Sequence, residues 1–282
     1  MSDSFSILAP AKTNLSLRVL GKREDGFHEI ETRMVPLTLA DELTLDWTKE
    51  NAVNLTCSDP DLPTGEENLA TKAVRALEQR TGKTFSLKIH IEKQIPSGAG
   101  LGGGSSDAAA VLRAINEMAE LNLSTEELAE VAAEVGSDVS FFVYGTVCDC
   151  RGRGEIVEPV EDFERELPVV LVKPNFEISA AFAYQNYVDS KAIPGVPYVS
   201  QICPWGEMVN DLERPVFQKH IVLARMKEWL LGQPEVHAAL MSGSGSTMLA
   251  VLNRDDAGTV LAGRVAKTYG KPTWTWVGAT SR

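Results

Sequence analysis

Alternating hydrophobic and polar residues begin near the N-terminus and predict a β-strand over residues 12–20. Every second residue from 15 to 19 is leucine or valine, which is the period-two pattern of a strand with one buried face. Lys12 and Asn14 therefore share the polar face of this strand. After a turn rich in glycine and charge, the same alternation continues and predicts further strands through residue 45.

A strand, a glycine-rich loop and a helix are predicted one after another between residues 85 and 118. Residues 85–91 alternate and lead into a loop with five glycines in the seven residues 98–104. From Asp107 onward, apolar residues recur every three or four positions. This change of period predicts a helix that begins where the glycines end.

The remaining segments predict a mixture of helices and strands. Ser124 and Glu127 form the pattern of a capping box, which predicts a helix that ends at Gly136. Because helices and strands are interleaved irregularly, the α+β class is favoured over a doubly wound sheet, with a division of the chain near residue 160. Further helices are predicted over residues 68–80 and 216–231, and further strands over residues 169–172 and 247–252.

The composition is that of an ordinary globular protein. The 282 residues are 44% hydrophobic and 23% charged, which suffices for a core in one large or two modest domains. The four cysteines include no C-x-x-C pair and have no clustered histidines, so neither a disulfide framework nor a zinc site is indicated. We expect reduced thiols in a cytoplasmic protein.

The charge balance disfavours binding to polyanions. With 27 basic and 39 acidic residues, the formal net charge is −12, and such a surface repels nucleic acid. No stretch of 18 apolar residues could cross a membrane, and the first residues lack a basic segment followed by an apolar one. We therefore expect no nucleic-acid or membrane partner and no targeting segment, whereas the oligomeric state stays open.

The glycine loop has the features of a phosphate site. Its glycines let an anion approach the main chain, and the helix that follows offers unpaired N–H groups at its N-terminus. A flexible surface loop is the alternative. The P-loop pattern fails because Gly98 and Gly103 are not followed by lysine and a hydroxyl residue. A dinucleotide site is disfavoured because Glu117 and Glu120 lie inside the predicted helix rather than after a second strand.

Several polar residues have ordinary alternatives when each is taken alone. Lys12 could be a surface lysine, and Asp138, which follows a helix end, could be an N-cap or turn residue. Asn14 could be a polar strand position and His28 a turn residue. The segment Met241–Ser246 could be a second glycine loop at the site or merely a tight turn.

Three sequence motifs resemble those of the galactokinase, homoserine, mevalonate and phosphomevalonate (GHMP) kinase superfamily. They are PAKTNL at residues 10–15, PSGAGLGGGSSDAAA at 96–110 and MSGSGS at 241–246, in the order that the superfamily has them. The strings PAKTNLSL, GKREDGFHEI, LGGGSSDAAA and GSDVSFF further resemble the branch that acts on a cytidine-diphosphate-linked methylerythritol.

This resemblance implies a two-lobed α+β fold. The lobe of residues 1–160 would resemble domain 2 of ribosomal protein S5, and the lobe of residues 161–282 would be ferredoxin-like. The implied reaction is ATP-dependent phosphorylation of the substrate's 2-hydroxyl in non-mevalonate isoprenoid synthesis, with Mg²⁺ accompanying ATP. The alternatives are another GHMP kinase that acts on homoserine, mevalonate or a sugar, and a module that binds nucleotide without turnover.

The resemblance also implies roles for individual residues. Lys12 and Asp138 match the catalytic pair. The phosphate loop of ATP matches Pro96, Ser97, Gly98, Ala99, Gly100, Leu101, Gly102, Gly103, Gly104, Ser105 and Ser106. Adenine is expected near Asn68 and Lys93, and the cytidine end near Asn14, Phe27, His28 and Tyr184.

The residue types suit this chemistry. An alcohol is a poor nucleophile, so a carboxylate that accepts its proton and a cation beside the developing alkoxide supply what phosphoryl transfer lacks. Rings at Phe27 and Tyr184 could stack on cytosine, or could simply fill core. Phe27 stands where the family commonly has tyrosine, so a hydroxyl is missing there; Ser97, Ser137 and Ser140 are also unusual. The magnesium ligands are not assigned, with Ser105 and Ser106 as candidates.

Overall fold

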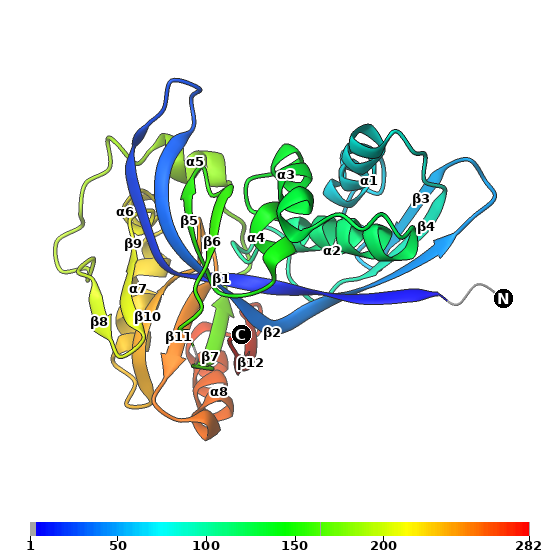
Figure 1. Cartoon of the computed structure of the whole chain (residues 1–282). Coiled ribbons are helices and arrows are strands. Elements are labelled where there is room, and N and C mark those ends of the chain that lie inside the picture. The colour runs from blue at the N-terminus through cyan, green and yellow to red at the C-terminus, as the bar shows by residue number, and fades with distance from the viewer. Residues whose placement is uncertain (1–3, 164, 282) are drawn as a thin grey trace.

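The structure is a computed structural model that describes residues 4–163 and 165–281 (Figure 1). Within these ranges the strands form a sheet of eight and a sheet of four. The strands are β1 (Phe5–Lys22), β2 (His28–Trp47), β3 (Val53–Cys57), β4 (Leu87–Glu92), β5 (Cys148–Gly152), β6 (Ile156–Pro159), β7 (Pro168–Lys173), β8 (Gln201–Cys203), β9 (Gly206–Asn210), β10 (Val236–Met241), β11 (Met248–Leu252) and β12 (Trp274–Ala279). The helices are α1 (Leu69–Thr81), α2 (Gly103–Met118), α3 (Thr125–Val135), α4 (Val139–Tyr144), α5 (Ala180–Gln185), α6 (Glu213–Lys219), α7 (Ile221–Leu231) and α8 (Gly258–Tyr269), with a 3₁₀ turn at Asp255–Ala257.

A long antiparallel hairpin of β1 and β2 runs through both halves of the molecule (Figure 1). Near one end β2 pairs with β4, and near the other it pairs with β5. The predicted alternation over residues 12–20 thus belongs to a strand of 18 residues, and its register shifts between Pro10 and Lys12 and between Asn14 and Ser16. These shifts locally change how β1 pairs with β2 beside the two polar residues singled out above.

Helices α1 to α4 pack with the sheet of β1, β2 and β4 in the first lobe. Their core includes Leu45, Leu77, Ile89 and Val111, all at most 1% exposed. The predicted helix over residues 68–80 is confirmed as α1, and the capping box at the start of α3 forms as predicted. The prediction that α2 begins after the glycines is wrong, because the helix already begins at Gly103.

The second lobe has a four-stranded antiparallel sheet in the order β10-β11-β7-β12. With α5 to α7 before β10 and α8 before β12, this is the ferredoxin-like order that the resemblance implied. Alternate residues of β7 point to opposite sides: Val170 and Val172 pack with the helices, and Val169 and Leu171 pack against β1 and β2. Burial on both faces explains why β7 and β11 read as continuous apolar runs.

One prediction for the second half needs correction. The predicted helix over residues 216–231 is two helices, α6 and α7, which meet at His220, where ψ is 69° and the backbone leaves the helical region. Helices α5 and α8 and strands β8, β9, β10 and β12 were not predicted. The strands predicted over 169–172 and 247–252 are confirmed as β7 and β11. The α+β class is confirmed as well.

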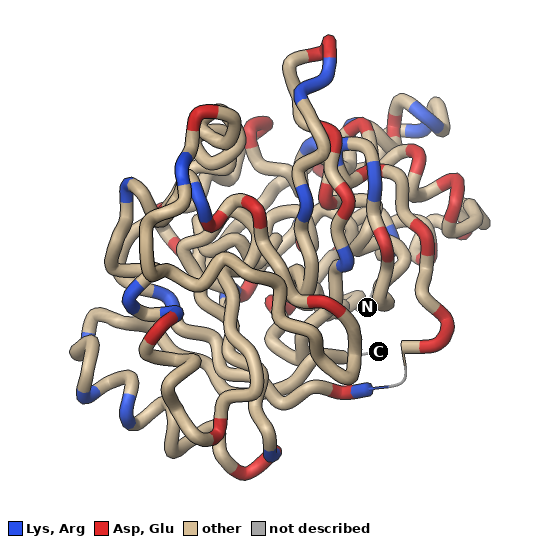
Figure 2. Tube along the Cα trace, turned by 90° about the vertical axis from the view of Figure 1, so that its left-hand side faces the viewer, with Lys and Arg blue, Asp and Glu red and all other residues tan. Residues whose placement is uncertain are grey.

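Strand β9 returns from the second half of the chain and pairs with β1 in the first sheet. The predicted division into residues 1–160 and 161–282 stays a prediction. In the described residues no helix has the length and apolar character needed to cross a bilayer. Residues 1–3, on which the expectation about targeting partly rests, lie outside the described ranges. Figure 2 shows basic residues dispersed among acidic ones along the trace, including the tip of the β1–β2 hairpin.

Candidate active site

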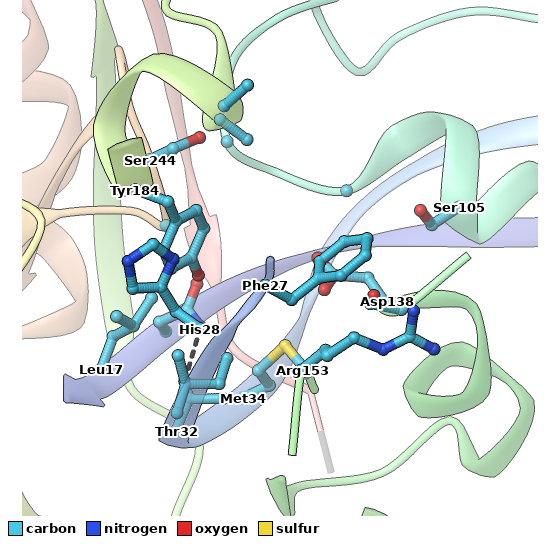
Figure 3. A pocket seen from close by; sticks show the side chains of 18 of the residues that line it. Leu17, Phe27, His28, Thr32, Met34, Ser105, Asp138, Arg153, Tyr184 and Ser244 are labelled. Atoms are coloured by element: carbon cyan, nitrogen blue, oxygen red, sulfur yellow. Dashed lines mark hydrogen bonds between the residues drawn. The ribbon is translucent and has the colours of Figure 1, made fainter. Parts of the chain in front are cut away.

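A cavity of about 600 Å³ lies where the β1–β2 hairpin, both glycine segments and helices α4 and α5 meet. In Figure 3 the rings of His28 and Tyr184 lie on one side of it, and Phe27, Asp138 and Arg153 lie on the other. The residues that line it include Lys12, Asn14, Asp25, Phe27, His28, Thr32, Gly100, Gly102, Ser105, Ser137, Asp138, Arg153, Tyr184, Gly243 and Ser244.

Lys12 is a buried cation whose ammonium group faces Asp138. The residue is 4% exposed, and its Nζ lies 3.6 Å from Asp138 Oδ2 and donates a 2.7 Å hydrogen bond to Asn14 Oδ1. Its backbone N–H also donates to the Leu101 carbonyl at 2.9 Å, which fixes β1 against the glycine loop. The alternative of a surface lysine is therefore wrong.

Asp138 occupies the N-cap position of α4, but its side chain makes no capping hydrogen bond. About a third of that side chain (37%) is exposed, and its carboxylate faces the cavity and Lys12. The carboxylate is therefore free to accept a bond from a ligand, unlike an aspartate that caps a helix.

Asn14 orients Lys12 through a short chain of hydrogen bonds. Its Nδ2 donates to Thr32 Oγ1 at 2.7 Å, and that hydroxyl donates to the Ser16 carbonyl at 2.6 Å. Its Oδ1 accepts from Lys12, so both ends of the amide already have protein partners. Contact between Asn14 and a cytidine group stays a prediction, whereas its role in fixing the ammonium follows from these bonds.

The first glycine loop packs directly against the second glycine segment. Gly98, Gly100 and Gly102 have φ values of 58°, 75° and 73°, which favour glycine. A Cβ at Gly100 would overlap the Ser242 carbonyl oxygen, and one at Gly102 would overlap the ring of Phe142. The glycines are thus required by loop packing, in addition to any approach of a phosphate.

The second glycine segment is part of the site and not merely a turn. Ser242 Oγ donates to the Gly100 carbonyl at 3.1 Å. Asn210 Nδ2 donates to the carbonyls of Met241 and Gly243, at 2.7 Å each, and so holds this segment in place. Sequence reasoning missed Asn210, because a polar residue at the end of a short strand has no local signal that distinguishes it.

The two serines proposed as magnesium ligands differ in their surroundings. Ser106 is 1% exposed, and its hydroxyl donates to the Pro10 carbonyl at 2.7 Å. Ser105 lines the cavity at the N-terminus of α2. Of the two hydroxyls, that of Ser105 is the one placed to contact a ligand there.

Aromatic rings form the end of the cavity opposite Asp138. The His28 and Tyr184 rings stack with centroids 5.6 Å apart. Burial, assisted by Lys22, lowers the pKa of His28, so its ring is neutral at pH 7 and offers one donor and one acceptor. Phe27 is 51% exposed, which excludes the alternative that it fills the core.

Arg153 is a second cation that lines the cavity, beside Phe27, and sequence reasoning missed it. Its guanidinium carbon lies 4.9 Å from the centroid of the Phe27 ring, and its Nε lies 3.5 Å from Glu155 Oε1. The signal available in the sequence was the run of alternating arginine and glycine at residues 151–154, which spans the end of β5 and the turn after it. Lys12 and Arg153 are the lysine and arginine that line the cavity in the described part of the chain.

Asn68 and Lys93 are not among the described residues that line this cavity. Asn68 is the N-cap of α1: its Oδ1 accepts from the Ala70 N–H at 2.8 Å, and its Nδ2 donates to the Pro63 carbonyl at 2.7 Å. The Lys93 ammonium is bonded to Asp41 and Asp107 in the interior. Contact of either side chain with adenine stays a prediction.

Comparison with known proteins first gives the class. The family described as GHMP kinases N terminal domain matches residues 68–146, which contain the glycine loop and Asp138. Solved structures of a homoserine kinase from Cytophaga hutchinsonii and a mevalonate kinase from Methanococcus jannaschii share the fold, each with a TM-score of 0.69. The comparison with the homoserine kinase covers 99% of this chain and 96% of the other at 18% identity. The comparison with the mevalonate kinase covers 99% of each chain at 13% identity. The chain has the GHMP kinase fold.

Closer relatives give the family. The 4-diphosphocytidyl-2-C-methyl-D-erythritol kinase of Methylacidiphilum infernorum is 38% identical over 90% of this chain and 88% of its own. The kinase of that name from Syntrophotalea carbinolica is 39% identical over 94% and 95%. A crystal structure of 4-(cytidine 5'-diphospho)-2C-methyl-D-erythritol kinase matches with a TM-score of 0.78 and 31% identity, over 99% of this chain and all (100%) of the other. The chain belongs to the 4-diphosphocytidyl-2-C-methyl-D-erythritol kinase family, which confirms the resemblance in the motifs.

The substitution Asp107→Asn is expected to make the protein more stable, increasingly so as the pH rises from about 4 to about 7.5. Burial raises the pKa of the Asp107 carboxyl to about 7, although Lys93 opposes this rise. The unfolded chain releases the proton near pH 4 and the folded protein releases it near pH 7, so ionisation destabilises the wild type across that interval. The gain in free energy of unfolding, measured by urea denaturation at several pH values, should reach at most about 4 kcal/mol. A gain that does not depend on pH would contradict this assignment.

Proposed function

We propose that this protein transfers the γ-phosphoryl group of ATP to the 2-hydroxyl of 4-diphosphocytidyl-2-C-methyl-D-erythritol, in the non-mevalonate route to isopentenyl diphosphate. The observation that carries the proposal is the Lys12–Asp138 pair, which lies between a glycine loop at a helix N-terminus and a pocket of aromatic rings. The names of the relatives described above support this substrate over homoserine, mevalonate or a sugar.

In the proposed mechanism Asp138 and Lys12 act on the acceptor hydroxyl. Asp138 accepts its proton as the oxygen attacks the γ-phosphorus, and ADP leaves with the electrons of the broken P–O bond. The Lys12 ammonium stabilises the negative charge that develops on the attacking oxygen and the transferred group. Because Asn14 already holds this ammonium in place, little reorganisation is needed in the transition state.

The glycine loop and the start of α2 would hold the phosphates of ATP. The first N–H groups of a helix have no carbonyl partner within it, and the helix dipole places partial positive charge there. Magnesium would come with the phosphates and supply charge neutralisation, and the oxygens of Ser105 and Asp138 suit its preference for hard ligands. Use of ATP also supports the predicted cytoplasmic location.

The cytidine diphosphate end would occupy the aromatic side of the cavity. The neutral ring of His28 can bond to the edge of cytosine, and the exposed ring of Phe27 can stack on its face. The Lys12 ammonium is already engaged by Asp138, so Arg153 is the cation available to the substrate diphosphate. A guanidinium can bind phosphate oxygens through two parallel hydrogen bonds.

The test of this function is release of ADP from Mg-ATP with the cytidyl compound, run beside homoserine, mevalonate and galactose. Turnover is expected with the cytidyl compound alone, and phosphorus NMR should place the new phosphate on the 2-hydroxyl. Turnover with one of the other alcohols would replace the substrate but keep the mechanism. ATP binding without turnover of any alcohol would indicate a binding module.

Replacing the proposed base, Asp138→Asn, is expected to lower kcat by about 100-fold or more, because the amide cannot accept the proton. The dissociation constant of ATP, measured by isothermal titration calorimetry, should change little. Asp256→Asn is the matched control, since Asp256 is an exposed residue of the second lobe whose ion pair among the described residues is with Arg254. A rate close to that of the wild type in the Asp138 variant would remove this residue from the mechanism.

Replacing the proposed diphosphate ligand, Arg153→Gln, is expected to raise KM for the cytidyl substrate about tenfold or more, because a charge-assisted hydrogen bond is lost. The KM for ATP should stay unchanged in the same steady-state assays. Arg151→Gln removes an equal charge two residues away, from a surface pair with Glu158, and should leave both constants unchanged. Equal effects of the two substitutions would show that only the overall charge matters.

A further inference from the structure

A buried carboxylate, Asp41 on β2, binds the segment that leads into the glycine loop. Asp41 is 0% exposed, and its Oδ1 accepts hydrogen bonds from the backbone N–H groups of Gln94, at 2.6 Å, and Ile95, at 2.8 Å. These two residues lie immediately before Pro96, where the loop begins. The beginning of the loop is therefore held by one oxygen of a single side chain.

The other oxygen of Asp41 connects, through Lys93, to the end of the loop. The Lys93 ammonium is hydrogen-bonded to Asp41 Oδ2 and donates a 2.8 Å bond to Asp107 Oδ2 on α2. It also lies against the first residue of that helix, 3.3 Å from where a Cβ on Gly103 would be. One ammonium thus joins the segment before the loop to the helix after it.

Burial makes this arrangement stiff. The side chains of Lys93, Asp41 and Asp107 are 8%, 0% and 5% exposed, so water does not compete for their hydrogen bonds. The two carboxylates raise the pKa of the Lys93 amine despite its burial, which keeps it charged. Charge-assisted bonds in such surroundings are stronger than neutral ones, and removal of one partner leaves a buried charge unpaired.

We propose that Asp41, Lys93 and Asp107 are positioning residues that form a clamp across the glycine loop and so set the affinity for ATP. The clamp fixes the distance and direction between the beginning of the loop and the N-terminus of α2, whose N–H groups must converge on the same phosphates. This role of Lys93 is exerted through the loop and is separate from the predicted contact of its side chain with adenine. This inference rests on one part of the proposed function, namely that the glycine loop binds ATP.

The experiment measures the dissociation constants of ATP and of cytidine 5'-diphosphate separately, by isothermal titration calorimetry without the alcohol substrate. In Asp41→Asn one carboxylate oxygen becomes an NH2 group, which cannot accept a hydrogen bond. This NH2 group would face either the Lys93 ammonium or the two backbone N–H donors, so the clamp is broken on one side. The dissociation constant of ATP is expected to rise about tenfold, while that of cytidine diphosphate stays within twofold. An unchanged affinity for ATP in the folded variant would overturn the clamp.

Asp107→Asn keeps the test decisive if Asp41→Asn fails to fold. It retains an oxygen for Lys93 but removes the charge, and ATP is expected to bind about threefold more weakly to a protein that is more stable at pH 7.5. A purely structural role would not lower affinity while stability rises. Wild-type affinity for ATP in this variant would overturn the proposal.

A control in the second lobe separates positioning from general loss of stability. Val265→Ala removes buried volume on α8 and should lower the melting temperature without changing either dissociation constant. If this variant weakens ATP binding as Asp41→Asn does, the clamp is overturned. If the wild type itself fails to bind ATP, the proposed function is overturned. If the wild type binds ATP and the substitutions leave its affinity unchanged, only the clamp is overturned.

Discussion

Burial of the Lys12 ammonium is the constraint on which the arrangement of the site depends. An uncompensated charge in the interior is costly, so the protein must supply an acceptor and an opposite charge within reach. Asn14 supplies the first and Asp138 the second, from a strand and from the start of a short helix. Both glycine segments also pack against this lysine, since a Cβ at Gly102 would lie 3.1 Å from its Cγ and one at Gly243 would lie 3.2 Å from its Nζ.

The sequence predicted those parts of the fold that depend on local periodicity and capping. Strand β1, helix α1 and the capping box of α3 follow from patterns within a few residues of each other. The break at His220 and the start of α2 inside the glycines were missed, because tertiary packing decides where each helix begins. Helix propensity alone makes a first turn that contains two glycines unfavourable.

The candidate site was predictable only where a motif marked it. Lys12, Asp138 and the glycine loop each had an ordinary alternative, and the order of the three motifs favoured a shared site. The 3.6 Å distance between Lys12 Nζ and Asp138 Oδ2 supports this choice. Asn210 and the partners of Lys93 were not predictable, and the arginine–glycine run at residues 151–154 did not show that Arg153 reaches the cavity. Their positions depend on contacts between segments far apart in the chain, such as β9 with β1, and no spacing in the sequence encodes these contacts.

The continuous β1–β2 hairpin limits how the two halves of the molecule can move. Two strands that cross from one half to the other without interruption offer no flexible linker about which rigid bodies could swing. Any opening of the cavity must come from bending or twisting of the hydrogen-bonded ladder itself, or from the loops at its rim. Strand β9 belongs to the second half of the chain but pairs with β1 in the first sheet, which connects the halves a second time. A chain cut near its middle would therefore not leave two autonomous fragments.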